Sequence, residues 1–159
     1  MTEPVENPAS ADLETWHRTF APRAFNQTWS LLDIEDPTRE EEEAMLASTF
    51  AQRYHWYEVG SPRQRAIAVW QVSRVASMLG YAELALRFGE RSLATCLDND
   101  LDAFVTGFAH EAIARAAAEV DDVDTFTEHL ETAKEKLLEI EDAEDRHVLE
   151  ADLTEMSER

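Results

Sequence analysis

The chain has 159 residues and a formal net charge of −20, because 14 Lys and Arg stand against 34 Asp and Glu. A charge this negative repels nucleic-acid phosphates and anionic membranes, so neither is expected as a partner. The length suits one domain with its own hydrophobic core. A single cysteine, Cys96, excludes an intrachain disulfide and fits a reducing compartment, so a cytoplasmic location is expected.

The chain begins with an acidic stretch, residues 1–9, that we expect to be a flexible tail. It lacks the apolar segment of a signal peptide, and no apolar run in the chain reaches the length that spans a bilayer. Apolar residues then recur at helical spacing over residues 10–32 and predict the first helix. Pro22 lies within this helix and should kink it or divide it in two.

The second predicted helix follows a short acidic link. Asp36 is its expected N-cap, and Pro37 suits its first turn. The four glutamates at residues 40–43 then lie near the positive end of the helix dipole, as is typical of a solvated helix start. The helix continues to Val59, so the first helix pair covers about residues 10–58.

The clearest signals surround a helical hairpin over residues 62–97. Ser61 is a good N-cap, and Pro62 suits the first helical position, where its missing N–H costs nothing. Gly80 is the expected left-handed stop between the two helices of the hairpin. Both helices carry small and apolar residues at helical spacing.

A third helix pair is predicted over residues 101–140. Its first helix is rich in alanine, which lets neighbouring helices approach closely, and its second has one regular apolar face. A last helix over residues 142–156 has a short apolar side and a highly charged remainder, as expected of a helix that caps a stack. The whole pattern predicts an all-α domain over residues 10–159, with about seven helices in antiparallel pairs.

An internal repeat supports this arrangement of pairs. Leu79-Gly80 and Val120-Asp121 lie 41 residues apart, and each is followed by a short polar turn and then by spaced small residues such as Ala85 and Ala133. This pattern resembles the tetratricopeptide repeat (TPR), whose first helix carries spaced large residues around Leu-Gly and whose second carries spaced alanines.

The resemblance is to the divergent, TPR-like class. The repeat is longer than the usual ~34 residues, and Ser73 or Ala114 occupies the glycine position. Residues 52–56 and 70–74 also look similar to small bacterial TPR-like proteins that have no assigned activity. The resemblance implies a short TPR-like α-solenoid with a charged C-terminal capping helix, and it supplies a fold without an activity.

In TPR-like stacks the first helix of each pair lines the concave face, which is the usual binding face. Helical spacing places large aromatic side chains beside arginines there, a combination typical of binding hot spots. The candidate binding residues are Arg53, His55, Trp56, Trp70, Arg74, Phe104, Phe108, Glu111 and Arg115. The alternative is that Trp70, Phe104 and Phe108 are ordinary core residues.

The charge distribution is uneven along the chain. Residues 52–95 contain six arginines and three acids, so this segment is +3 and the remainder is −23. A basic centre favours a carboxylate or an acidic segment as ligand, unless its arginines pair with acids of the same chain. Arg74 and Arg115 are the stronger binding candidates. The basic clamp with which some TPR domains hold a peptide C-terminus is not expected, since Trp70 and Glu111 occupy its positions.

Catalytic and metal-binding motifs are largely missing. The chain has no glycine-rich phosphate loop, no Cys/His zinc spacing and no nucleophile elbow. Two Glu-x-x-His pairs, Glu14/His17 and Glu144/His147, have the spacing of di-iron ligands, but chance explains them in so glutamate-rich a chain. His129 and His147 look solvated, while His55 and His110 remain candidates for a ligand or a base. We expect no cofactor.

The sequence therefore predicts a non-enzymatic module that binds a protein or peptide partner in a concave groove. One alternative is a self-associating structural subunit, a homodimer in which the basic centre meets an acidic face of the other copy. Another is a helical protein that binds a small ligand or a metal.

Overall fold

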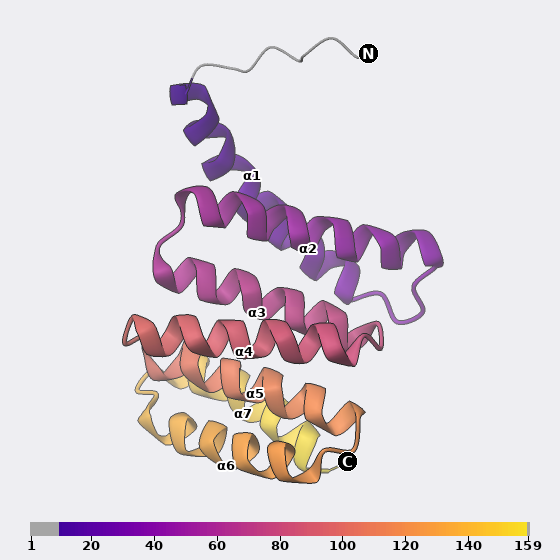
Figure 1. The fold of residues 1–159 in the computed structure, drawn as a ribbon, viewed down its shortest axis with the longest axis vertical. Helices are drawn as coiled ribbons and strands as arrows, with labels where there is room; N and C mark the ends of the chain where they lie inside the picture. The colour runs from indigo at the N-terminus through magenta and orange to yellow at the C-terminus, as the bar shows by residue number, and fades with distance from the viewer. Residues whose placement is uncertain (1–9, 159) are drawn as a thin grey trace.

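The computed structural model describes residues 10–158, and these form seven α-helices and no strand. The predicted tail over residues 1–9 lies outside the described residues. The all-helical prediction is confirmed (Figure 1). The helices are α1 (Ser10–Leu32), α2 (Arg39–Val59), α3 (Pro62–Met78), α4 (Ala82–Asp98), α5 (Ala103–Glu119), α6 (Val123–Glu139) and α7 (Ala143–Ser157).

Helices that follow one another in the chain pack side by side as the pairs α1–α2, α3–α4 and α5–α6 (Figure 1). Adjacent pairs are joined through α2–α3 and α4–α5 contacts, and α3 also touches α5. The last helix, α7, packs against both α5 and α6. This pattern of pairs is consistent with a helical repeat. Within residues 10–158 no helix has the length and apolar character needed to cross a bilayer.

Local signals explain where the central hairpin begins and turns. The Ser61 side chain accepts a hydrogen bond from the Gln64 backbone N–H, and the Gln64 side chain accepts one from the Ser61 N–H. This capping box satisfies two backbone donors at the start of α3. Gly80 has φ +78°, a conformation that a residue without a Cβ adopts at little cost, and it ends the helix as predicted.

One expectation for the first pair is wrong, and one of the two alternatives for Pro22 is excluded. The N-cap of α2 is Thr38, not Asp36, because Thr38 forms a capping box with Glu41 and Asp36 has no such glutamate three residues on. Pro22 does not divide the first helix: α1 is continuous from Ser10 to Leu32.

The register between helices is fixed by four buried polar side chains. Two glutamines and two serines donate hydrogen bonds to backbone carbonyls of neighbouring helices, and every one of these bonds begins or ends on α3. The bonds run from Gln52 Nε2 to Ala68 O (2.8 Å), Gln71 Nε2 to Phe25 O (3.1 Å), Ser73 Oγ to Ala85 O (2.7 Å) and Ser92 Oγ to Ala66 O (2.9 Å). Buried polar groups need such partners, so these bonds select one alignment of α1–α4.

In the C-terminal part, α7 approaches α5 closely at a glycine. A Cβ built on Gly107 would lie 2.7 Å from Leu149 Cδ2 and 3.3 Å from Lys136 Cβ. Both Gly107 and Leu149 are buried. The absence of a side chain at Gly107 therefore lets α7 sit against the α5–α6 pair.

We expect Gly107→Val to lower the free energy of unfolding by roughly 2 kcal/mol, because the added carbons overlap Leu149 and force α7 outward. Urea unfolding followed by far-UV circular dichroism measures this change. Ala118→Val is the matched control, since it adds a β-branched residue to an exposed position of the same helix. Because valine is a better helix former than glycine and a poorer one than alanine, a loss in Gly107→Val no larger than that in Ala118→Val would contradict the role of the α5–α7 contact.

Candidate functional site

A cavity of about 360 Å³ lies on the face shared by the odd-numbered helices. We call it the central cavity. Its lining comes from α1, α3, α5 and α7, four segments that are far apart in the sequence. The lining residues are Phe25, Trp29, Ile67, Trp70, Arg74, Phe104, Val105, Phe108, Val148 and Asp152.

Aromatic rings form a continuous row along this cavity. The ring centroids of Trp29 and Trp70 are 5.8 Å apart, and those of Trp70 and Phe108 are 5.2 Å apart. Phe104 follows, 5.0 Å from Phe108 in an edge-to-face arrangement. Trp70 and Phe108 are each 8% exposed. Such contacts hold the rings in fixed orientations, so the cavity has a rigid apolar wall.

A cluster of four charged residues adjoins Trp70 of this row. Glu111 is fully buried and accepts hydrogen bonds from the Arg115 guanidinium (Nε to Oε1, 2.7 Å) and from Trp70 Nε1 (3.4 Å). Arg74 lies 3.6 Å from Glu111 Oε1 and 3.3 Å from Asp152 Oδ2. Asp152 Oδ2 is also 3.7 Å from Arg115. Two cations and two anions balance, which a buried charged cluster requires.

The structure brings six of the nine predicted binding residues together. Trp70, Arg74, Phe104 and Phe108 line the central cavity, and Glu111 and Arg115 lie directly behind it. The two aromatics with the lowest exposure, Trp70 and Phe108, thus belong to both the core and the cavity wall.

The other three predicted residues, all on α2, do not line this cavity. The Arg53 guanidinium stacks over Tyr57, 4.4 Å from its ring centroid. His55 contacts His17 across the α1–α2 pair. Trp56 lies at the end of α2 beside Gly60. The described residues that line the cavity all come from the odd-numbered helices, so α2 contributes none of them.

Six lining residues were not among the predicted set, and two of them, Ile67 and Val105, lie on α3 and α5 beside predicted ones. Phe25 and Trp29 come from α1, where helical spacing identified them only as apolar positions of the first helix. Val148 and Asp152 come from α7, which was expected to act as a cap. Nothing in the local pattern links either helix to Trp70, because the contact depends on how the first and last helices pack.

Two histidine pairs each join the helices of one pair. The Nδ1 atoms are 2.8 Å apart in both His17–His55 and His110–His129. The expectation that His129 is solvated is wrong, since it is half-buried against His110. Burial lowers the pKa of His110 to about 4, with further lowering by the nearby charges of His129 and Lys136. Burial, followed by the proximity of His17, also lowers the pKa of His55.

The other candidates for chemistry are the possible metal ligands and Cys96. Among residues 10–158, no group of three or more His, Cys, Asp and Glu side chains is arranged to hold a metal ion. Cys96 is buried, and burial raises the pKa of its thiol to about 11, so the thiolate is strongly disfavoured. It fills core volume beside Ala66, Val105 and Ala109.

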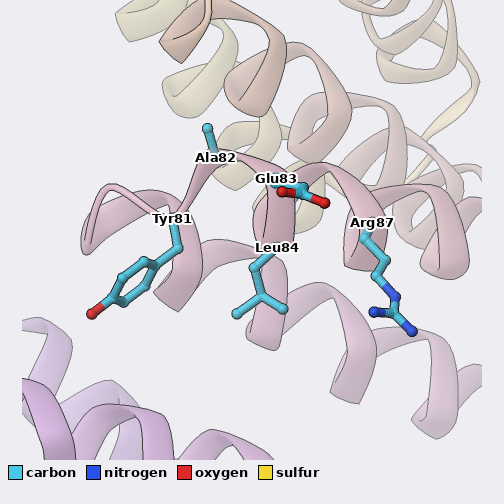
Figure 2. Close-up of a pocket in the computed structure, with 5 residues that line it drawn as sticks. All are labelled: Tyr81, Ala82, Glu83, Leu84 and Arg87. Atoms are coloured by element: carbon cyan, nitrogen blue, oxygen red, sulfur yellow. The ribbon is translucent and has the colours of Figure 1, made fainter.

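A second hollow of about 370 Å³ lies at the start of α4 and is formed by one short segment. Figure 2 shows Tyr81, Leu84 and Arg87 pointing to one side of the helix and Ala82 to the other, with Glu83 between them. A site built by a single segment has no opposing wall, so it lacks the concave shape of a ligand pocket. The central cavity is therefore the stronger candidate.

No family model, curated protein or solved structure matched the chain in comparisons with known proteins.

We expect Glu111→Ala to lower the free energy of unfolding by about 3 kcal/mol, because it removes the buried carboxylate that neutralises the positive charges of Arg115 and Arg74. Chemical denaturation monitored by tryptophan fluorescence measures this loss. Glu135→Ala, an exposed change on α6, should stay within ~0.5 kcal/mol of the native protein. A Glu111→Ala variant as stable as Glu135→Ala would contradict the assigned role of this cluster.

The His110–His129 pair of α5 and α6 predicts that folding stability falls as the pH is lowered. The pKa of folded His110, about 4, is below its ordinary value, so the unfolded chain takes up a proton first as the pH falls. The contribution of His110 to the free energy of unfolding is therefore fully present above pH ~6.5 and declines as the pH falls toward ~4. We expect His110 to contribute about 1 kcal/mol of loss between pH 7 and pH 5, since partial exposure screens the charges.

This contribution is measured as the difference between the native protein and His110→Gln in urea unfolding at the two pH values. His147→Gln, which changes an exposed histidine on α7, is the control and should keep the native pH dependence. Identical pH dependence of the native protein and His110→Gln would refute the assignment.

Proposed function

We propose that this chain is a divergent TPR-like α-solenoid of the cytoplasm that acts as a non-enzymatic binding module. In this proposal, the concave face is the face of α1, α3, α5 and α7, and the central cavity receives one side chain of a protein or peptide partner. The observation that carries the proposal is the cavity itself, in which residues from four helices, three of them contributing aromatic rings, converge on a space of about 360 Å³. Concave, mostly apolar sites of this size are typical of ligand pockets.

The lining favours an apolar anchor. Eight of its ten residues are aromatic or aliphatic, and the two charged ones, Arg74 and Asp152, are 3.3 Å apart. Both basic candidates of the cavity region, Arg74 and Arg115, already contact carboxylates of this chain. An acidic ligand would have to displace these carboxylates. A Phe, Trp, Leu or Ile side chain meets no such competition and gains from burial.

Charge outside the cavity favours basic residues around that anchor. The net charge of −20 attracts cations over long distances, which raises the rate of encounter more than the final affinity. We therefore propose a peptide segment with one large apolar residue flanked by Lys or Arg.

A binding role fits the chemistry of the lining better than catalysis does. Among the described residues that line the cavity there is no Ser, Thr, Cys, Lys or His. A nucleophile or a general base would have to come from Asp152, which is engaged with both arginines.

The test is selection of ligands from a random dodecapeptide library on the immobilised protein, followed by calorimetric titration of a synthetic consensus peptide. We expect the consensus to contain an aromatic or branched aliphatic anchor. Val148→Glu should raise its Kd at least ten-fold, because Val148 lies at the mouth of the cavity and the new carboxylate obstructs an apolar side chain. Val148 is 52% exposed, so the change should not affect folding.

Leu138→Glu provides the matched control, since it makes the same kind of change at a position on α6 that is 85% exposed and is not part of the lining. It should bind the peptide with native affinity. Failure to enrich any apolar anchor, or equal binding by the native protein and Val148→Glu, would rule out the central cavity as the binding site.

A further inference from the structure

An exposed aromatic patch lies at the N-terminal end of the molecule, away from the central cavity. It consists of Leu13, Trp16 and Phe20 of α1 and Tyr54 of α2, which are 38%, 56%, 40% and 57% exposed. We call it the N-terminal patch. Leu13, Trp16 and Phe20 recur at i, i+3 and i+7, so they lie on one face of α1. His17 joins this face to α2, with its ring centroid 5.5 Å from that of Tyr54.

The first half of α1 has little support from the rest of the chain. Every residue from Asp12 to Phe20 is exposed except His17, which is half-buried. Figure 1 shows this part of α1 extending beyond the stacked helices. A short helical segment is marginally stable on its own, and an exposed set of large apolar side chains marks an interaction site. Trp and Tyr are also the residues most enriched in binding hot spots.

The charges along α1 indicate which partner fits. Residues 10–32 contain two acids and two arginines, so this helix is neutral in a chain of charge −20. Asp12 and Arg23 are 11 residues apart, close to three helical turns, and therefore lie along the same edge of the apolar stripe. The Arg23 guanidinium lies 5.9 Å from the ring centroid of Phe20, which places it at the edge of the patch. The other two charges, Glu14 and Arg18, bond to each other.

We propose that the N-terminal patch is the interface of a homodimer in which the α1 helices of two copies pack antiparallel about a two-fold axis near Trp16. In this arrangement Leu13 of each copy faces Phe20 of the other. Residues on the same edge of two antiparallel helices meet, so Asp12 of each copy lies opposite Arg23 of the other. A two-fold interface requires a self-complementary surface, and an acid at one end with a base at the other meets that requirement.

A second copy is also the partner that overall charge permits at this helix. Two chains of charge −20 repel each other over most of their surface, and a neutral helix flanked by opposite charges reduces that repulsion. A uniformly acidic or basic partner would match one end of α1 and oppose the other.

The experiment is light scattering after size-exclusion chromatography on the full chain, with sedimentation equilibrium to obtain the dimer Kd. We expect the native protein to have twice the 18.1 kDa mass of one chain. Trp16→Glu should give the mass of a single chain, because the two-fold axis would bring the new carboxylates of the two copies close together, where they repel each other. Trp16 is 56% exposed, so this variant should fold, as circular dichroism would verify.

Charge reversal tests the antiparallel geometry. Asp12→Arg and Arg23→Asp should each raise the dimer Kd roughly ten-fold, because each turns two attractive pairs into repulsive ones. The double variant Asp12→Arg/Arg23→Asp should restore native affinity. Val123→Glu, at a 67% exposed position on α6, is the control and should remain dimeric.

A monomeric native protein, a Trp16→Glu variant that stays dimeric, or a double variant weaker than either single variant would each overturn the proposal. The result is independent of the peptide-binding test, because the N-terminal patch and the central cavity share no residue.

Discussion

The fully buried carboxylate of Glu111 is the constraint on which the candidate site depends. A charged group without solvent must be neutralised by nearby partners, and Glu111 finds them in Arg115 on its own helix and in Arg74 and Trp70 on α3. Asp152 of α7 balances the second arginine. The positions of α3, α5 and α7 are therefore linked through one charged cluster, and the central cavity takes its shape from that linkage.

The starts and ends of the helices could be predicted from the sequence because capping and turn residues act over only a few neighbouring positions. Ser61, Pro62 and Gly80 act on their own backbone or on residues within one turn, so the hairpin of α3 and α4 could be located without the rest of the fold. The start of α2 shows how close alternatives are resolved. Asp36 and Thr38 are both good cap residues, but the glutamate that completes a capping box lies three residues after Thr38.

The site could be predicted only as far as helical spacing reaches. The spacing of Trp70 and Arg74, and that of Phe104, Phe108, Glu111 and Arg115, identifies one face of α3 and one face of α5. It does not say whether α2 reaches that surface, and His55, predicted to border it, contacts His17 of α1 and is absent from the cavity lining. The lining residues from the first and last helices reach the cavity through tertiary packing, which a short stretch of sequence does not reveal. Similarly, the sequence around His129 predicts a solvated side chain, because its partner His110 is on another helix.

The two serine bonds between α3 and α4 have a mechanical consequence. Ser73 and Ala85 stand six residues on either side of Leu79, and Ala66 and Ser92 stand thirteen residues on either side, so the two bonds are two helical turns apart. An axial slide of either helix by a single residue, about 1.5 Å, misaligns both hydroxyls at once. The two bonds, one near the turn of the hairpin and one nearer its open end, therefore fix the axial register of α3 against α4 along most of their length.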